Sequence, residues 1–275
     1  MPNFIFKNNQ LVKRERANIA IDDRGWLFGD GIFETCKIFN AKIYNFKAHQ
    51  SRINEGLKNL KFPKDSANCF KNLEKKAQQL ITKNKIKSGL LKISISRGSG
   101  SLGYLPTYDS QPLVIIQTFA ARKLPAKINL GISSIKTPNF SFGKTLNALP
   151  YVLAKIEAQE KNLFDNVMLS EKKFIGETSS ANIFWVKNGK IFTAKKSGGI
   201  IFGTVCQRLI KISPQKIYLV DAKISALKKA DEIFLTNSAF GILSVDEFLG
   251  RKLSKNLANN LKEILEKDIE KLCQK

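Results

Sequence analysis

The chain alternates between strand-like and helix-like segments, and this order limits its fold more than any other feature. Its first strand patterns are rich in β-forming residues, and two of them fold around asparagine-containing turns, as hairpins do. Between the second and third strand patterns, residues 48–60 and 66–87 repeat apolar residues at intervals of three and four, the period of an amphipathic helix. This part of the chain is therefore predicted to combine a sheet with helices. The strand patterns lie at 3–12, 31–46, 89–100 and 111–120.

Residues 122–128 are predicted to be a linker, because the segment around them is polar and is interrupted by Pro125. We therefore expect an α+β protein, with a smaller N-terminal α/β domain at 1–121 and a larger C-terminal mixed-sheet domain at 129–275. The elements predicted for the second domain are strands at 129–136, 165–170 and 231–238, a helix at about 146–161, a hairpin turn at Asn188 and Gly189, a short helix after Gly203, and an amphipathic C-terminal helix.

The chain of 275 residues carries a net charge of +23, which alone suggests a nucleic-acid partner. The distribution of the charge argues against this partner, because lysines are mixed with acidic residues on the outer faces of predicted helices, as in 71–89 and 261–275. No basic block is interleaved with aromatic residues. The diffuse charge instead favours small anionic substrates by raising their local concentration. A cofactor-free binding protein is the alternative that rests on charge alone.

Several other classes of protein are not indicated. Apolar stretches such as 112–120 are far shorter than the roughly 20 residues of a membrane span, and residues 1–16 lack the pattern of a secretory signal. We expect a cytoplasmic protein without a membrane partner. The cysteines lack CxxC spacing and His49 is the single histidine, so we expect neither a metal site nor a disulfide framework. The thiols expected to be reduced and structural are Cys36, Cys69, Cys206 and Cys273.

Two segments carry the functional interpretation. Lys144 stands in "SFGKTLNALPYVLAKIEA", just before a predicted helix, where a loop can present it to a cleft. Glu177 opens the run of small residues in "GETSSANIF", at the mouth of a predicted hairpin. Taken alone, Lys144 is interpreted as a solvated surface cation and Glu177 as a solvated charge in a turn.

Together, the two segments resemble the signature of the class IV, fold-type IV pyridoxal phosphate-dependent aminotransferase family: a lysine, a helix, a strand, then a glutamate before small residues. The resemblance extends in order over "DRGWLFGDGIFET", "AHQSRI" and "GGIIFGTVCQRLI". It implies a two-domain enzyme that binds pyridoxal 5'-phosphate. Lys144 would hold this cofactor as a Schiff base and later move protons, and Glu177 would keep the pyridine nitrogen protonated.

The resemblance also assigns groups to the cofactor phosphate. Arg52 in "HQSRI" matches the family arginine that binds it, and a guanidinium suits a phosphate by charge and by geometry. A glycine before a predicted helix would let the N–H groups of Thr204 and Val205 face the anion. Asn237 and Ser238 match further phosphate donors, with a plain turn as the alternative.

The reaction depends on residues outside this signature, because the family includes D-amino-acid aminotransferases, branched-chain aminotransferases and 4-amino-4-deoxychorismate lyase. The first of these carry an arginine and a histidine where this chain has Leu102 and Tyr104. "ISRGSG" and "ADEIFLTNSAFGILSV" most resemble the lyase, although lyases commonly have arginine at position 102. The expected products are 4-aminobenzoate, a folate precursor, and pyruvate. The alternative is a branched-chain or D-amino-acid aminotransferase.

Other residues receive roles from the same resemblance. Arg97 is a candidate to bind a substrate carboxylate, its alternative being a surface arginine at the end of a strand. Thr35 is a candidate proton donor to the leaving group, its alternative being a structural threonine. His49 matches a family histidine, which we interpret as structural, and Arg24 belongs to the shared motif and is either structural or substrate-binding. Family members are homodimers, so we expect a homodimer.

Overall fold

The fold is described from a computed structural model of the chain. The structure describes residues 2–63, 71–107, 110–121, 123–138, 143–196 and 199–274. The chain divides into two compact units. The first unit comprises Met1–Arg122, Phe142–Ala148 and Glu270–Lys275, and the second comprises Lys123–Ser141 and Leu149–Ile269. The first unit thus includes two segments that follow the predicted linker in the chain, and the predicted domain bounds stay a prediction.

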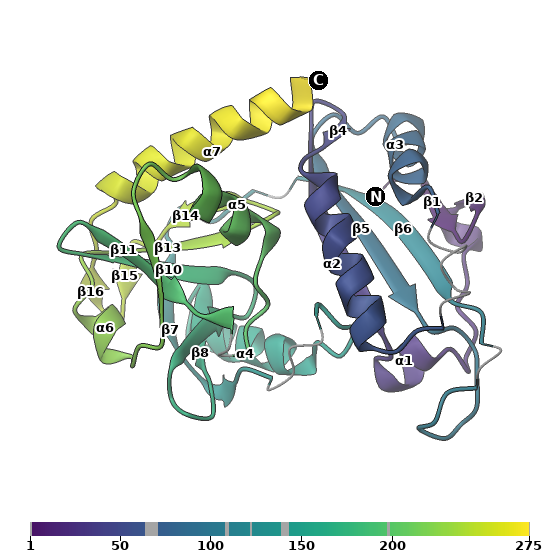
Figure 1. The fold of residues 1–275 in the computed structure, drawn as a ribbon, viewed down its shortest axis with the longest axis horizontal. Coiled ribbons are helices and arrows are strands. Elements are labelled where there is room, and N and C mark those ends of the chain that lie inside the picture. The colour runs from purple at the N-terminus through teal and green to yellow at the C-terminus, as the bar shows by residue number, and fades with distance from the viewer. Residues whose placement is uncertain are drawn as a thin grey trace. The chain divides into compact units, whose positions relative to one another are not determined.

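The first unit is built on a six-stranded sheet with the order β2-β1-β6-β5-β3-β4 (Figure 1). All neighbouring strands in this sheet are antiparallel. Its strands are β1 (Phe4–Lys7), β2 (Gln10–Lys13), β3 (Gly31–Phe39), β4 (Lys42–Ile43), β5 (Gly89–Ser96) and β6 (Leu113–Ala120). The hairpin β1-β2 and the strands β5 and β6 lie where the sequence predicts them.

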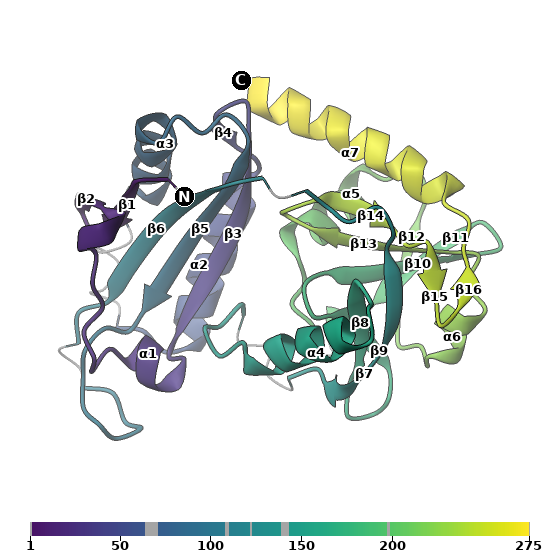
Figure 2. The ribbon, with the colours of Figure 1, turned by 180° about the vertical axis from the view of Figure 1, so that it is seen from behind.

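Two helices cover one face of this sheet, α2 (Phe46–Asn59) and α3 (Leu73–Lys83), as the views from front and back show for α2 (Figures 1 and 2). Alternate residues of β3, among them Ile32 and Cys36, point into the same core as apolar residues of both helices. Within the helix predicted at 66–87, positions 66–70 lie outside the described residues, and Cys69 is one of them.

A short helix in the first unit is absent from the sequence prediction. Helix α1 (Arg24–Phe28) begins where the Asp23 carboxylate accepts hydrogen bonds from the N–H groups of Gly25 and Trp26, at 2.8 and 3.2 Å. It ends at Gly29, whose φ of +67° favours glycine. One 3-10 turn, η1 (Arg14–Arg16), precedes it.

The second unit contains two five-stranded sheets, with the orders β12-β11-β10-β13-β14 and β16-β15-β7-β8-β9. Both mix parallel and antiparallel pairs, which confirms the expected mixed-sheet domain. Their strands are β7 (Asn129–Lys136), β8 (Asp165–Leu169), β9 (Ile175–Thr178), β10 (Asn182–Lys187), β11 (Lys190–Ala194), β12 (Ile217–Val220), β13 (Glu232–Asn237), β14 (Gly241–Ser244), β15 (Glu247–Phe248) and β16 (Arg251–Lys252).

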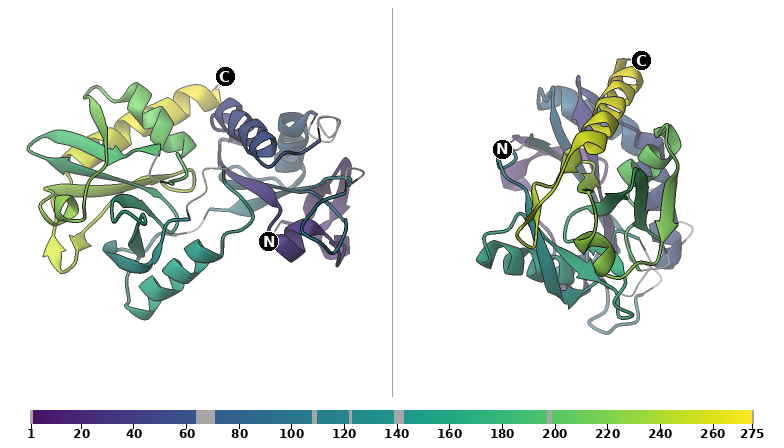
Figure 3. Two further views of the ribbon diagram at one scale, coloured as in Figure 1. Left: turned by 60° about the horizontal axis from the view of Figure 1, so that its bottom comes forward. Right: turned by 90° about the vertical axis from the view of Figure 1, so that its left-hand side faces the viewer.

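Helices pack against these sheets (Figure 3), and a second apolar core is formed mainly by strand residues, together with Leu227 of the short helix at 225–228. Helix α4 (Leu149–Glu160) lies against β7 and β8, and α5 (Thr204–Ile212) lies against β13. The other helices are α6 (Ser225–Lys228) and α7 (Asn256–Gln274). The start of α7 is bonded to β13, because the buried Glu232 carboxylate accepts from the N–H groups of Leu257 and Ala258.

The structure confirms the expected α+β class. Strand β7 has the predicted bounds, and Asn188 and Gly189 turn the β10-β11 hairpin with φ values of +49° and +72°. Helix α4 begins at Leu149 rather than at 146, and Pro150 lies in its first turn, where proline is tolerated. Among the described residues, no helix combines the length and the apolar composition needed to cross a membrane. Three buried thiols are Cys36, Cys206 and Cys273.

Candidate active site

Lys144 lies in the first unit, in a segment bonded to the start of β3. The Phe33 N–H donates to the Lys144 carbonyl at 2.8 Å, and the Leu146 N–H donates to the Gly31 carbonyl at 2.9 Å. Gly143, the preceding residue, has a φ of +111°, which favours glycine. Lys144 Nζ lies 4.5 Å from the centre of the Phe33 ring. The backbone therefore determines the point from which the lysine side chain extends.

Arg52 is held by a carboxylate that the sequence analysis did not single out. Arg52 Nε donates to Glu34 Oε1 at 2.5 Å, and Nη2 donates to Oε2 at 2.7 Å. Nδ1 of His49, one turn earlier on α2, lies 2.7 Å from the same Oε2. The three-residue spacing places His49 and Arg52 on the helix face that meets β3. His49 thus occupies the hydrogen-bonded position expected of a structural residue.

The Glu34 carboxylate stays ionised although it is 1% exposed. Burial raises its pKa, but attraction to the Arg52 charge and hydrogen bonds from His49 and Arg52 outweigh burial and lower the pKa from 4.5 to about 2. A signal for Glu34 is present in the sequence, because it shares the buried face of β3 with Ile32 and Cys36. A charge at such a position requires a partner.

Thr35 follows Glu34 on β3 and therefore points to the opposite face of the sheet. It is half-buried and lies opposite Lys92 of β5. The structure thus separates the Thr35 hydroxyl from the Glu34 carboxylate. Its role as a proton donor stays a prediction.

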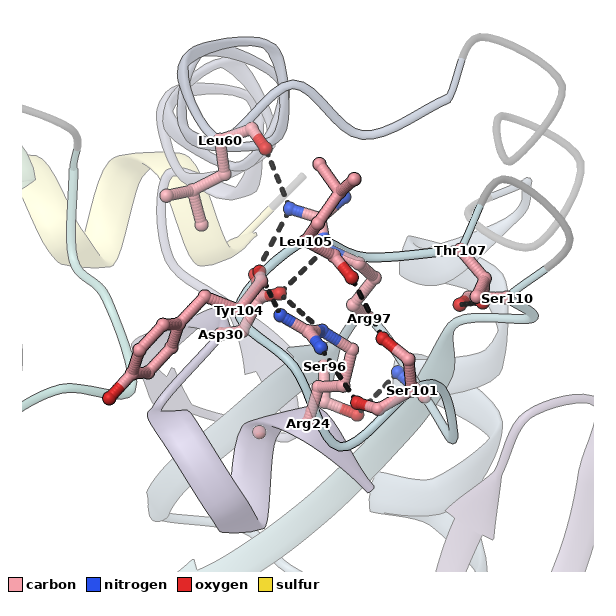
Figure 4. A network of polar contacts seen from close by, with 12 residues as sticks. Arg24, Asp30, Leu60, Ser96, Arg97, Ser101, Tyr104, Leu105, Thr107 and Ser110 are labelled. Atoms are coloured by element: carbon pink, nitrogen blue, oxygen red, sulfur yellow. Dashed lines mark hydrogen bonds and ion pairs between the residues drawn. The ribbon is translucent and has the colours of Figure 1, made fainter. Parts of the chain in front are cut away.

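Arg97 is 6% exposed and its guanidinium is bonded to protein groups (Figure 4). Its Nε and Nη2 donate to the two oxygens of Asp30 at 2.7 and 3.0 Å, and Nη2 also donates to the Leu60 carbonyl at 2.7 Å. The Phe62 ring centre lies 4.3 Å from the guanidinium carbon. Arg97 therefore joins the end of β5 to the end of α2, and its use by a substrate carboxylate stays a prediction.

Arg24, also in the network of Figure 4, holds the loop that follows β5. Its Nε donates to Asp30 at 3.1 Å, and Nη1 and Nη2 donate to the carbonyls of Gly103 and Tyr104, both at 2.7 Å. Arg24 is 2% exposed, so the structure favours the structural alternative for this residue. The anchored loop carries the side chains of Leu102 and Tyr104, which are 85% and 88% exposed.

Glu177 lies on β9 in the second unit and is 3% exposed, so it is no solvated turn charge. Oε1 accepts the hydroxyl of Tyr151 at 2.9 Å and the N–H of Ile201 at 3.0 Å. Oε2 accepts Nδ2 of Asn182 at 3.3 Å. Tyr151 and Asn182 were missed in the sequence analysis, although Asn182 lies in the quoted "GETSSANIF" segment. A buried carboxylate with several donors is suited to remain an anion.

Thr204 and Val205 are the first residues of α5, and Gly203 precedes them as the N-cap. The N-terminal end of a helix presents backbone N–H groups and a positive dipole end, which together suit an anion such as phosphate. The Thr204 hydroxyl lies 3.3 Å from the Ser238 hydroxyl, so the structure brings two of the predicted phosphate ligands together.

Asn237 closes the turn after β13. Its Oδ1 accepts the N–H groups of Ala239 and Phe240 at 2.9 and 3.0 Å, and its Nδ2 donates to the Ser180 carbonyl at 3.0 Å. These contacts support the turn alternative for Asn237. Its role as a phosphate donor stays a prediction.

Comparison with known proteins identifies the family. A family model described as amino-transferase class IV matches residues 31–248, so the chain belongs to the class IV aminotransferase family. Membership of this family confirms the pyridoxal 5'-phosphate cofactor and the fold expected from the sequence. The donor set suits that cofactor, because it includes a buried carboxylate for a protonated ring nitrogen and a helix N-terminus with hydroxyls for a phosphate.

Relatives with different reactions are similar to this chain to nearly the same degree. An aminodeoxychorismate lyase of Vibrio harveyi is 28% identical, over 90% of this chain and 96% of the relative. A D-alanine aminotransferase of Listeria monocytogenes is 27% identical, over 90% of this chain and 88% of the relative. The solved branched-chain amino acid aminotransferase from Escherichia coli has a TM-score of 0.87 and 20% identity, over 98% of this chain and 95% of that chain.

Replacing Glu34 should change how stability depends on pH. The pKa of Glu34 in the folded protein is below its ordinary value, so its contribution is present above pH 4.5 and is lost as the pH falls toward 2. A shift of this size corresponds to roughly 3 kcal/mol. Urea unfolding at a series of pH values should show that the free energy of unfolding falls less steeply between pH 4.5 and 2 for Glu34→Gln than for the wild type. Glu266→Gln, at an exposed site on α7, is the control, and equal slopes for all three proteins would contradict the assignment.

Tyr151 should resist ionisation. Burial, and then the charge and hydrogen bond of Glu177, raise the pKa of its hydroxyl far above the ordinary value of 10.0. The tyrosinate absorbance of the wild type and of Tyr151→Phe should therefore rise equally through that pH region. Glu177→Gln removes the neighbouring negative charge and should lower the pKa of Tyr151. A smaller absorbance rise in Tyr151→Phe near pH 10 would contradict this environment.

Proposed function

We propose that the protein is an aminodeoxychorismate lyase that converts 4-amino-4-deoxychorismate to 4-aminobenzoate and pyruvate, a step in folate biosynthesis. The observation that carries this proposal is the loop held by Arg24. It exposes Leu102 and Tyr104 at the two positions where D-amino-acid aminotransferases carry an arginine and a histidine. Neither leucine nor tyrosine offers a cation to a substrate carboxylate. The similarity to the Vibrio harveyi lyase supports the same reaction.

An aminotransferase is the second candidate function. The D-alanine aminotransferase relative and the solved branched-chain aminotransferase favour it, because identities of 27% and 28% do not separate the two reactions. The segment "GIFET", residues 31–35, fits a branched-chain substrate better than a D-amino acid. An aminotransferase also requires a keto acid for its second half-reaction, which a lyase does not.

The proposed mechanism assigns a task to each residue. When bound, pyridoxal 5'-phosphate supplies an electron sink for charge that develops on the substrate. The Lys144 amine holds the cofactor and then takes the proton from the amine-bearing carbon of the substrate. The Glu177 carboxylate would keep the ring nitrogen protonated. The candidates to bind the phosphate are Arg52 and the N–H groups of Thr204 and Val205. Elimination of the enolpyruvyl group, which leaves as the enol of pyruvate, then makes the substrate ring aromatic.

Further ligands complete this proposal. Thr35 donates a proton to the leaving enolpyruvyl oxygen. Arg97 is the candidate for one substrate carboxylate, and Asn237 and Ser238 are candidates for further phosphate contacts. The net charge of +23 supports an anionic substrate.

The proposal includes a cytoplasmic homodimer. Helix α4 supports the dimer, because its apolar side chains at positions 149, 152, 153 and 156 are between 43% and 61% exposed and follow the spacing of one helix face. Light scattering on the purified protein measures the oligomeric state directly.

The assay that tests the reaction compares two substrates. Purified protein loaded with cofactor should release 4-aminobenzoate from 4-amino-4-deoxychorismate without any added keto acid. It should convert leucine with 2-oxoglutarate poorly or not at all. Efficient transamination of leucine, with 4-amino-4-deoxychorismate left unchanged, would replace the lyase by the aminotransferase.

Leu102→Arg should increase the affinity for 4-amino-4-deoxychorismate. A charge-assisted hydrogen bond to a carboxylate contributes about 1.5–3 kcal/mol, which corresponds to about one to two powers of ten in affinity. Steady-state kinetics on 4-amino-4-deoxychorismate should therefore show a lower KM and a nearly unchanged kcat. Leu105→Arg, on the same loop and 78% exposed, is the matched control for added charge. An equal fall in KM for both variants would show a general charge effect and would contradict a contact specific to position 102.

A further inference from the structure

The amide of Asn182 joins two segments of the second unit. Asn182 is the first residue of β10 and is 3% exposed. Its Nδ2 donates to Glu177 Oε2 at 3.3 Å and to the Ile201 carbonyl at 2.8 Å. Its Oδ1 accepts the N–H of Gly203 at 2.9 Å. One buried side chain is thus bonded to the carboxylate on β9 and to the chain that leads into α5.

The contact with Gly203 leaves no room for a side chain there unless the Asn182 amide moves. A Cβ atom at Gly203 would lie 2.4 Å from Asn182 Oδ1, well inside contact distance. The φ of Gly203 is −63°, which any residue can adopt, so this position needs glycine for space and not for its backbone conformation. The amide of Asn182 therefore sets the position of the N-cap of α5.

Ile201 closes a ring of hydrogen bonds with the other two residues. Its N–H donates to Glu177 Oε1 at 3.0 Å, while its carbonyl accepts from Asn182. Because Asn182 is also bonded to Glu177, three residues from three segments hold one another. The hydroxyl of Tyr151, on α4, adds a further donor to Glu177 Oε1.

The backbone register extends this arrangement to β13. Asn182 pairs with Thr236 in the antiparallel β10-β13 ladder, and Asn237 and Ser238 follow Thr236 directly. The Ser238 hydroxyl in turn contacts the Thr204 hydroxyl of α5. Asn182 therefore lies between Glu177 and the cluster of hydroxyls at the start of α5.

We infer that Asn182 is a positioning residue that fixes the distance between the two ends of the cofactor site in the second unit, the Glu177 carboxylate and the N-terminus of α5. The inference rests on the roles proposed for Glu177, Thr204 and Val205. An amide is required, because the position needs a donor toward Glu177 and an acceptor for the Gly203 N–H at once. An aspartate would keep the acceptor but would lose the donor and place a second negative charge beside Glu177.

Binding of pyridoxal 5'-phosphate to the apoprotein, followed by absorbance and by quenching of intrinsic fluorescence, tests the inference without any substrate. Asn182→Ala should weaken binding by about tenfold or more, since it removes hydrogen bonds to a charged group and to the helix start. The same change should cost much less in a Glu177→Gln background, because Asn182 acts in part through the Glu177 carboxylate. A full, additive loss in that background would overturn the inference.

Two further variants serve as a control and as a replacement for Asn182→Ala. Asn84→Ala is the matched control, because Asn84 in the first unit also bonds a backbone N–H and a backbone carbonyl, both of Phe4. Asn84→Ala should leave cofactor affinity unchanged, and an equal loss with Asn182→Ala would overturn the inference. If Asn182→Ala does not fold, Asn182→Asp takes its place. Adding Glu177→Gln to Asn182→Asp should restore thermal stability, because a glutamine can donate to the new carboxylate; no recovery would count against the inference.

The outcome is distinguishable from failure of the proposed function. Non-additive binding losses in a protein without lyase activity would leave the positioning role intact and remove the lyase. Additive losses in a protein that releases 4-aminobenzoate would remove the positioning role and leave the lyase reaction intact.

Discussion

A carboxylate buried away from water must be surrounded by donors or cations, and this requirement organises both units of the protein. In the first unit, Glu34 holds Arg52, and Asp30 joins Arg97 to Arg24. In the second unit, Glu177 gathers donors from three separate segments. Removal of one donor would leave a buried carboxylate with fewer hydrogen bonds, which costs free energy. The side chains proposed to bind the cofactor are thereby held by protein contacts.

The sequence predicts most of the scaffold, because strand alternation, helical period and turn residues are local signals. Strand β7 and the β10-β11 hairpin are examples. The side-chain networks cannot be predicted from local signals, because their members lie far apart in the chain. Arg97 and Asp30 are 67 residues apart, and nothing near Arg97 in the sequence shows that its guanidinium is bonded inside the protein. In the sequence, Tyr151 resembles any other residue of a helix, and only the fold shows that its hydroxyl donates to Glu177.

The reaction is decided by few side chains on a scaffold that relatives share. The roles proposed for Glu177, Lys144 and the start of α5 concern the cofactor, so they are compatible with both a lyase and an aminotransferase. The proposal therefore distinguishes the reactions by the loop held by Arg24, which carries Leu102 and Tyr104. Relatives with different activities match this chain at 27% and 28% identity, so overall identity does not separate a lyase from an aminotransferase.

Lys144 is the residue proposed to carry pyridoxal 5'-phosphate, and the roles proposed for the other cofactor ligands depend on this attachment. Borohydride reduction of the cofactor-loaded protein, followed by proteolysis and mass mapping, locates the attachment point. The account predicts a pyridoxyl group on the peptide that contains Lys144, and no stable label in Lys144→Ala. A label on a different lysine in the wild-type protein, retained in Lys144→Ala, would contradict it.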